Sequence, residues 1–250
     1  SNTLAPSQSG ERPALRRGGP AWTLSGPAAR VPWGRGAKHV VVLAESGGKP
    51  MVARVAGGAA KVEPDTNLAL EPRDTLTWST AAVPTAGTAD SLPPDSLWLA
   101  GAMARAAQMA GGLEFLLSQS VKYVSERKQF GKPLSTFQVI QQNLALLAGH
   151  TAAAGMAAQA AFHAMEKGDA SFEIACAKIR VGEAAGLGAG IAHQAHGAIG
   201  FTYEHTLHFV TRRLWSWRAE FGAEGYWAER LGREVAARGA QALWPMLTSR

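Results

Sequence analysis

The sequence predicts an α+β fold, in which an antiparallel β-domain over residues 1–93 is followed by an up-down α-helical bundle over residues 94–250. Composition changes near residue 94. Before it the chain is rich in proline, glycine and β-branched residues and contains strand-like runs. After it the apolar residues recur at helical spacing. A chain of 250 residues can bury a sizeable core, and it is long enough for two domains.

The β-domain is predicted from two apolar runs on either side of a turn. His39–Glu45 and Met51–Ala56 read as strands, and Ser46–Gly48 between them suits the connecting turn. Alternation over Leu68–Leu70 and over Leu76–Trp78 is typical of strands with one buried face. We therefore expect strands at both of these later positions as well.

The first helix is predicted directly after Pro93 and Pro94. Asp95 or Ser96 can cap it, and we expect it to end near Arg127. The helix is predicted from an apolar stripe close to helical spacing, which consists of Leu99, Met103, Leu113, Leu117, Val121 and Val124.

The second helix is predicted from the spacing of a capping box. The Ser135 hydroxyl can accept from an early amide of the helix, and Gln138 can reach back to an amide at the cap. The helix is expected to start there and to run to about Lys167, where Gly168 ends it.

Three further helices complete the predicted bundle. Asp169 is expected to cap the third, which reaches about His196. The remaining two are expected over residues 204–217 and 224–243. Long helices with short connections pack as an antiparallel bundle.

Composition and charge narrow the class of protein. Apolar residues at 46% and charged residues at 18% describe a globular chain that is not disordered. The lone Cys176 excludes an internal disulfide and fits a reducing cytoplasm. Residues 137–165 carry no formal charge, but several polar residues interrupt them, which favours a buried bundle over a membrane span. The net charge of +6 would suit a phosphate-bearing ligand; nucleic acid is less favoured because the basic residues are dispersed.

Two histidine pairs are the candidate metal ligands. His193 and His196 are three residues apart, as are His205 and His208, so each pair could share one face of a helix. Without a cysteine or a clear carboxylate set beside them, we predict no metal site. Capping, cofactor or interface roles are the alternative.

Three motifs in order resemble the acyl-CoA dehydrogenase family. ERKQFGKPLSTFQ (Glu126–Gln138) is similar to the arginine, aromatic-glycine and glutamine pattern that opens its C-terminal helical domain. HQAHGAIGFTYEHTLHFVTRR (His193–Arg213) resembles its glutamine- and glycine-rich flavin segment, and WTLSGPAARVPWGRGAKHVVVLA (Trp22–Ala44) resembles its β-domain stretch beside the flavin. The resemblance implies an FAD-dependent α,β-dehydrogenation of an acyl-CoA or related thioester by a homodimer or tetramer.

The resemblance also implies the cofactor-binding residues of the helical part. Arg127 and Gln138 would hold the diphosphate and ribityl regions of one flavin, and Phe130 would cover the adenine or the ring edge. An arginine fork suits phosphate oxygens better than a lysine does. Taken alone, the same stretch could instead be a basic, capped turn between two helices.

A second subunit would complete each flavin site according to the resemblance. Gln194 and the backbone around Gly197 and Gly200 would approach the same cofactor from that subunit. Missing glycine side chains permit close contact with a ligand.

The catalytic base is where the sequence departs from the family. Most members have a glutamate in a Tyr-Glu-Gly-Thr-like segment, and the matching segment here is Ala219–Gly222. If Gly222 matches the motif's glycine, Phe221 occupies the base position and Glu220 lies one residue early. Glu220 is the candidate base, and a solvated glutamate or one paired near Arg218 is the alternative. Other members carry the base on the first helix, but no acid lies near residues 101–102 here.

Other departures leave three functions open. Arg30 and Pro32 fall near the family's flavin-facing tryptophan and threonine, and Ala198 replaces a common glycine. The sequence includes no match to the family's N-terminal helical domain, so the resemblance implies either a fragment of a longer enzyme, a naturally shortened homologue or one subunit of a mixed assembly. The leading hypothesis is an acyl-CoA dehydrogenase-type enzyme. The alternatives are a non-catalytic FAD-binding subunit, in which a related subunit supplies the missing parts, and a cofactor-free helical oligomerisation or interaction protein.

Overall fold

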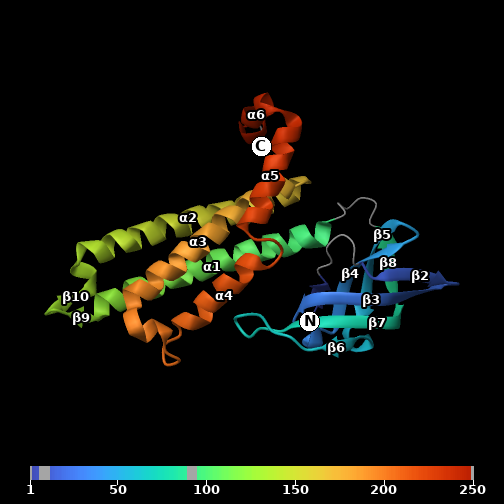
Figure 1. Ribbon diagram of the computed structural model, residues 1–250, viewed down its shortest axis with the longest axis horizontal. Coiled ribbons are helices and arrows are strands. Elements are labelled where there is room, and N and C mark those ends of the chain that lie inside the picture. The colour runs from blue at the N-terminus through green and yellow to red at the C-terminus, as the bar shows by residue number, and fades with distance from the viewer. Residues whose placement is uncertain (1, 6–11, 89–94, 249–250) are drawn as a thin grey trace. The chain divides into compact units, whose positions relative to one another are not determined.

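The computed structural model describes residues 2–5, 12–88 and 95–248, and it divides the chain into two compact units. Ser1–Gly101 forms the first unit and Ala102–Arg250 the second. The first contains a β-sheet and the second contains helices (Figure 1), which confirms the predicted α+β class. The expected boundary at residues 93 and 94 lies outside the described residues.

One mixed sheet forms the β-unit. Its strands follow the order β6-β7-β3-β2-β4-β5-β8, and β1 also pairs with β4. The pairings are antiparallel except for β1 with β4 and β2 with β4, which are parallel. The strands are β1 (Asn2–Ala5), β2 (Ala14–Gly18), β3 (Ala21–Pro32), β4 (His39–Ser46), β5 (Lys49–Ala56), β6 (Lys61–Glu63), β7 (Arg73–Val83) and β8 (Thr85–Thr88).

The predicted hairpin of β4 and β5 is confirmed. Its register runs from His39 opposite Ala56 to Ser46 opposite Lys49, so Gly47 and Gly48 alone make the turn. Their φ angles of 58° and 77° are those that a two-residue hairpin turn requires and that glycine adopts most easily.

The core of the β-unit lies on one face of these strands. Leu76 and Trp78 of β7 are 0% and 1% exposed, as their alternation predicts. They pack with valines, leucines and alanines of β3, β4 and β5 into a single apolar cluster.

The strand predicted over Leu68–Leu70 is wrong. These residues form a turn, in which Leu68 and Leu70 are 57% and 67% exposed and Leu70 has a φ of 61°. The physical cause is Asn67, whose Oδ1 accepts hydrogen bonds of 3.0 Å from the backbone N–H groups of Ala69 and Glu71. An asparagine side chain that binds its own neighbouring backbone competes with strand pairing.

Antiparallel helices form the second unit (Figure 1). Small residues let them approach closely: a Cβ on Gly188 would lie 2.6 Å from Leu113 Cδ2 and 3.0 Å from Leu147 Cδ1, so three helices meet at this glycine. The helices are α1 (Ser96–Glu126), α2 (Gln138–Lys167), α3 (Ser171–His196), α4 (Leu207–Ala219), α5 (Glu224–Arg238) and α6 (Leu243–Thr248). Within the described residues, no helix combines the length and apolarity that a bilayer span requires.

The predicted apolar stripe of α1 needs one correction. Val121 is 46% exposed, whereas Leu116, Ser120 and Val124 are buried. The buried face advances from Leu113 in steps of three and four residues, and Val121 lies outside it.

The predicted capping box at the start of α2 is also wrong. A 3-10 turn over Leu134–Thr136 precedes the helix, and Phe137 is its N-cap residue without a side-chain cap. The Ser135 carbonyl accepts from Gln141 Nε2 at 2.9 Å, so Ser135 lies before the helix and does not open it.

The predicted end of α2 at Gly168 and the predicted role of Asp169 at the start of α3 agree with the structure. Gly168 terminates α2 with a φ of 134°, and the Asp169 carboxylate accepts a 2.9 Å bond from the Ser171 N–H at the start of α3. The expected helix over residues 224–243 is shorter, because Gly239, with a φ of 86°, ends α5 at Arg238.

Candidate functional site

A small hairpin between α1 and α2 presents the first predicted site residues. Strand β9 (Lys128–Gln129) pairs with β10 (Lys132–Pro133), which leaves Phe130 and Gly131 as the turn, with φ angles of 54° and 79°. Such a conformation is uncommon for a bulky residue. Phe130 is nevertheless 89% exposed, and its ring meets the ring of Phe137 edge-on at a centroid distance of 6.1 Å. The hairpin thus holds an aromatic ring out toward solvent.

Arg127 and Gln138 lie at the two ends of this hairpin segment. The Arg127 N–H donates to the Tyr123 carbonyl and the Arg127 carbonyl accepts from the Leu134 N–H, both at 2.9 Å. The backbone of Arg127 is therefore fixed while its side chain is exposed. Gln138 is the exposed first residue of α2, where unpaired amides and the helix dipole favour an anion.

The end of α3 carries the second group of predicted flavin-site residues. Gln194 is exposed in its last turn, and Gly197 ends the helix with a φ of 66°. An added Cβ on Gly197 would meet no atom within 4 Å, so its backbone faces open space. Gly200, in the 3-10 turn η4 (Gly197–Phe201), is buried, and a Cβ there would lie 3.0 Å from Leu207. Gly197 can therefore admit a ligand, whereas Gly200 is needed for packing.

Tyr123 connects the two sets within one chain. Its ring stacks on His196 at a centroid distance of 4.4 Å and meets His205 edge-on at 6.1 Å. Because its carbonyl also binds the Arg127 amide, the base of the hairpin and the end of α3 belong to one neighbourhood. Figure 1 shows β9 and β10 at the end of the bundle toward which α3 runs.

The donors of this neighbourhood suit a flavin dinucleotide. A guanidinium, two side-chain amides and a helix N-terminus are groups that bind diphosphate and polar oxygens, and the open backbone at Gly197 permits close approach. In the β-unit, Arg30 is exposed at a φ of 55°, and Pro32 lacks a backbone N–H. The helical residues therefore fit FAD, while the two β-unit positions offer neither the aromatic face nor the hydroxyl expected there.

The turn between α4 and α5 fixes the region of the expected base. Phe221 and Gly222 have φ angles of 56° and 91°, and Trp227 Nε1 donates to the Phe221 carbonyl at 3.0 Å. A Cβ on Gly222 would lie 2.5 Å from Tyr226 Cδ1, so no other residue fits without a shift. Phe221 itself is buried, at 7% exposed.

Glu220 is held by an arginine. Arg105 Nε donates to Glu220 Oε2 at 2.6 Å, and both side chains are at most 10% exposed. The Arg105 guanidinium also lies 5.6 Å from the ring of Trp217. The ion pair engages Oε2 of Glu220, so one oxygen of the candidate base already has a charged partner. Arg218, the partner considered from the sequence, binds Glu224 instead at 2.6 Å.

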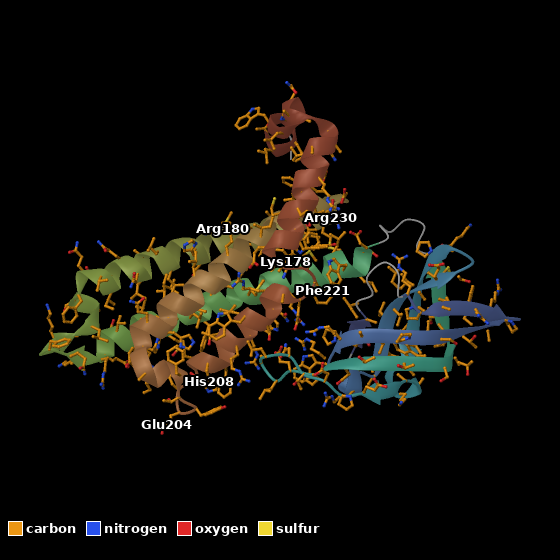
Figure 2. The ribbon with its side chains drawn as sticks, in the orientation of Figure 1. Lys178, Arg180, Glu204, His208, Phe221 and Arg230 are labelled. Carbon is orange, nitrogen blue, oxygen red and sulfur yellow. The ribbon has the colours of Figure 1, made fainter. Side chains whose placement is uncertain are left out.

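Lys178 of α3 is a residue that the sequence reasoning missed. Its Nζ donates to the carbonyls of Trp217, Arg218 and Glu220 at 3.1, 3.2 and 2.9 Å (Figure 2). These bonds satisfy carbonyls at the end of α4 and anchor the turn that follows. Burial lowers the pKa of Lys178 to about 8. The signal available was a lysine in the alanine-rich run IACAKIRVGEAA.

The histidines pack as aromatic groups. His196 meets His205 at a centroid distance of 4.8 Å, and Ala192 O binds His196 Nδ1 at 2.7 Å. Burial lowers the pKa of His196, and His205 lowers it further. The described part of the chain contains no group of three histidine, cysteine or acidic side chains arranged to hold a metal ion.

The chain is similar to acyl-CoA dehydrogenases in sequence. The family model for the acyl-CoA dehydrogenase C-terminal domain matches residues 99–237. Acyl-CoA dehydrogenase IpdE2 of Mycobacterium tuberculosis is 34% identical over 108 residues, which is 43% of this chain and 33% of that protein. Glutaryl-CoA dehydrogenase of Desulfococcus multivorans is 35% identical over 108 residues, covering 41% of this chain and 28% of that protein. The chain thus spans about a third of the length of these relatives.

The fold extends the similarity to the β-unit. The crystal structure of the ChsE4-ChsE5 complex from Mycobacterium tuberculosis matches with a TM-score of 0.80 and 25% identity, over 94% of this chain and 66% of that chain. The resemblance carried by the three motifs is thereby confirmed, and this chain belongs to the acyl-CoA dehydrogenase family.

Proposed function

We propose that the chain is part of an FAD-dependent enzyme that dehydrogenates the α,β bond of an acyl-CoA or related thioester. The proposal is supported by one arrangement: Arg127, Phe130 and Gln138 are exposed together around the hairpin between α1 and α2, where they would hold one flavin that the end of α3 of a second subunit approaches. Bound FAD would supply the hydride acceptor for the β carbon. The chain itself would bind the cofactor and take the α proton.

Each candidate residue has a distinct role in this proposal. Arg127 and Gln138 would bind the diphosphate and ribityl regions, and the exposed ring of Phe130 would cover the adenine or ring edge. Gln194 and the open backbone at Gly197 would add polar contacts. Gly200 would act indirectly, because it keeps the turn after α3 packed.

The cofactor proposal is tested by FAD titration of Arg127→Ala beside Arg233→Ala. The Arg233 side chain is 79% exposed on α5, so it is a matched control outside the site. Loss of charge-assisted bonds to phosphate should weaken FAD binding by about tenfold or more in Arg127→Ala. The control should bind like the parent protein. Equal affinities in all three proteins would remove Arg127 from the flavin site.

A second candidate is a subunit that binds FAD but leaves proton abstraction to a partner. It is favoured by Phe221 at the base position and by the Arg105–Glu220 ion pair, which would have to open before Glu220 could act as the base. The crystallised ChsE4-ChsE5 complex, whose name gives two different chains, is similar in fold to this chain. Acyl-CoA turnover by the protein purified alone would exclude this candidate. Turnover only after co-expression with a related subunit would support it.

A homodimer or tetramer, or an assembly with a related subunit, is the proposed quaternary state. The support comes from α2, which exposes large apolar side chains that a packed interface would cover. We propose a cytoplasmic location from the lone cysteine. The exposed large apolar side chains of α2 are Val139, Leu146, Met156, Phe162 and Met165.

A further inference from the structure

A cavity of about 240 Å³ lies among α3, α4 and the segment between them. Thr211 and Arg212 lie three and four residues after His208 and four and three residues before Trp215, so the four side chains share one face of α4. The remaining lining residues, His193, Phe201 and Tyr203, come from α3 and the segment that follows it. None of the seven is a residue proposed above for the flavin.

Aromatic rings form most of the wall of this cavity. His193 stacks with Phe201 at a centroid distance of 4.2 Å and with Trp215 at 5.6 Å, at interplanar angles of 22° and 12°. Tyr203 meets His208 edge-on at 5.3 Å. Phe201 and Tyr203 are 70% and 87% exposed, which is unusual for rings that would gain from burial. The cavity therefore favours a flat aromatic occupant.

Within the described part of the chain, the ring of His208 has unsatisfied nitrogen atoms at the wall of the cavity. His208 is 8% exposed, and neither of its ring nitrogens has a hydrogen-bond partner among the described residues. A neutral imidazole carries one N–H donor and one acceptor, and buried polar atoms are paired as a rule. His193, in contrast, forms a hydrogen bond of 2.9 Å between its Nε2 atom and the Thr211 hydroxyl. Figure 2 shows His208 on α4, near the segment that carries Glu204. The occupant should therefore carry hydrogen-bonding atoms in or on its ring.

The volume and charge of the cavity further limit the class of ligand that it can bind. Pockets for drug-sized ligands have volumes of about 300 to 1,000 Å³, so 240 Å³ suits one ring system and excludes a whole dinucleotide. Arg212 adds a guanidinium to the lining, which suits an anionic group attached to the ring. We propose that this cavity is a second ligand site, which binds the base of a purine nucleotide and directs the phosphate toward Arg212.

The test is a calorimetric titration of the full-length protein, saturated with FAD, with adenosine monophosphate. Tyr203→Ala removes an exposed ring, and His208→Phe keeps a ring but removes both nitrogens. Each should weaken binding by about tenfold or more, because stacking or hydrogen bonding to the base is lost. His163→Phe is the matched control, since His163 is 75% exposed on α2 and outside the cavity. It should change the affinity by less than about twofold.

Two further measurements separate this site from the flavin site and from simple anion binding. In a titration without FAD, Arg127→Ala should leave nucleotide binding unchanged; a parallel loss would place the nucleotide in the proposed flavin site and overturn the inference. Inorganic phosphate should compete much more weakly than the nucleotide, and equal competition would overturn recognition of the base. Unchanged affinity in both Tyr203→Ala and His208→Phe, with melting temperatures equal to the parent, would also overturn it.

Discussion

The buried ion pair of Arg105 and Glu220 gives a quantitative prediction. The two side chains are 10% and 7% exposed and 2.6 Å apart, so neither can regain full hydration when the other is removed. Removing one partner of a buried pair costs about 3–5 kcal/mol, because a charge remains buried without compensation. We expect Arg105→Met and Glu220→Leu each to lower the free energy of unfolding by this amount.

The double variant distinguishes ion pairing from packing. With both charges replaced by apolar groups, no uncompensated charge remains, and the combined loss should be smaller than that of either single variant. Urea unfolding of the parent, both single variants and the double variant measures the coupling. Arg233 and Glu229 provide a control cycle, because their pair is 79% and 62% exposed and should contribute less than about 1 kcal/mol. Additive losses at residues 105 and 220 would show that the two side chains do not stabilise each other.

Three further predictions concern the same helical unit. Lys178→Met should lower the free energy of unfolding by about 1.5–6 kcal/mol in urea unfolding at pH 7. Its three bonds to carbonyls stabilise by about 1.5–3 kcal/mol each, and about 3 kcal/mol of that total is offset by the burial that lowers its pKa from 10.5 to about 8. Exposed Lys122→Met should be near neutral, and equal midpoints for the two would contradict this. Gly222→Ala should lower the free energy of unfolding by about 1–3 kcal/mol, because the φ of Gly222 is 91° and the new Cβ would lie 2.5 Å from Tyr226. Thermal melting measures this loss, and a melting temperature equal to the parent's would exclude the strain. Burial lowers the pKa values of His193 and His196 below 6.5, so the unfolded chain binds more protons, and stability should be greatest above pH 6.5 and fall as the pH drops through the folded-state values. Urea midpoints that do not change between pH 7.5 and pH 5 would contradict the histidine account.

Local features of the fold could be predicted from the sequence because each depends on neighbouring residues. The two-glycine turn after Ser46 and the end of α2 at Gly168 need only the conformational freedom of glycine. The alternation over Leu76–Trp78 needs only the period of a strand. Leu68–Leu70 has the same alternation, and it failed as a predictor because Asn67 binds the backbone locally.

Residues of the candidate site could likewise be predicted only where they depend on a short local motif. Arg127 and Gln138 were identified because their short motif resembles a family pattern, and the hairpin between them is local. The partner of Glu220 is 115 residues away in the sequence, and the carbonyls bound by Lys178 are 39 to 42 residues away. No residue pattern specifies such pairings, because they arise only when the helices pack.

We propose that the hairpin of one subunit and the end of α3 of another form part of a working flavin site. The most direct test is the visible absorption spectrum of the purified full-length protein before and after incubation with FAD, with the oligomeric mass measured on the same sample. The account predicts a flavin band at stoichiometric binding in an assembly of at least two subunits. A protein that binds no FAD after incubation, alone or with a related subunit, would contradict it.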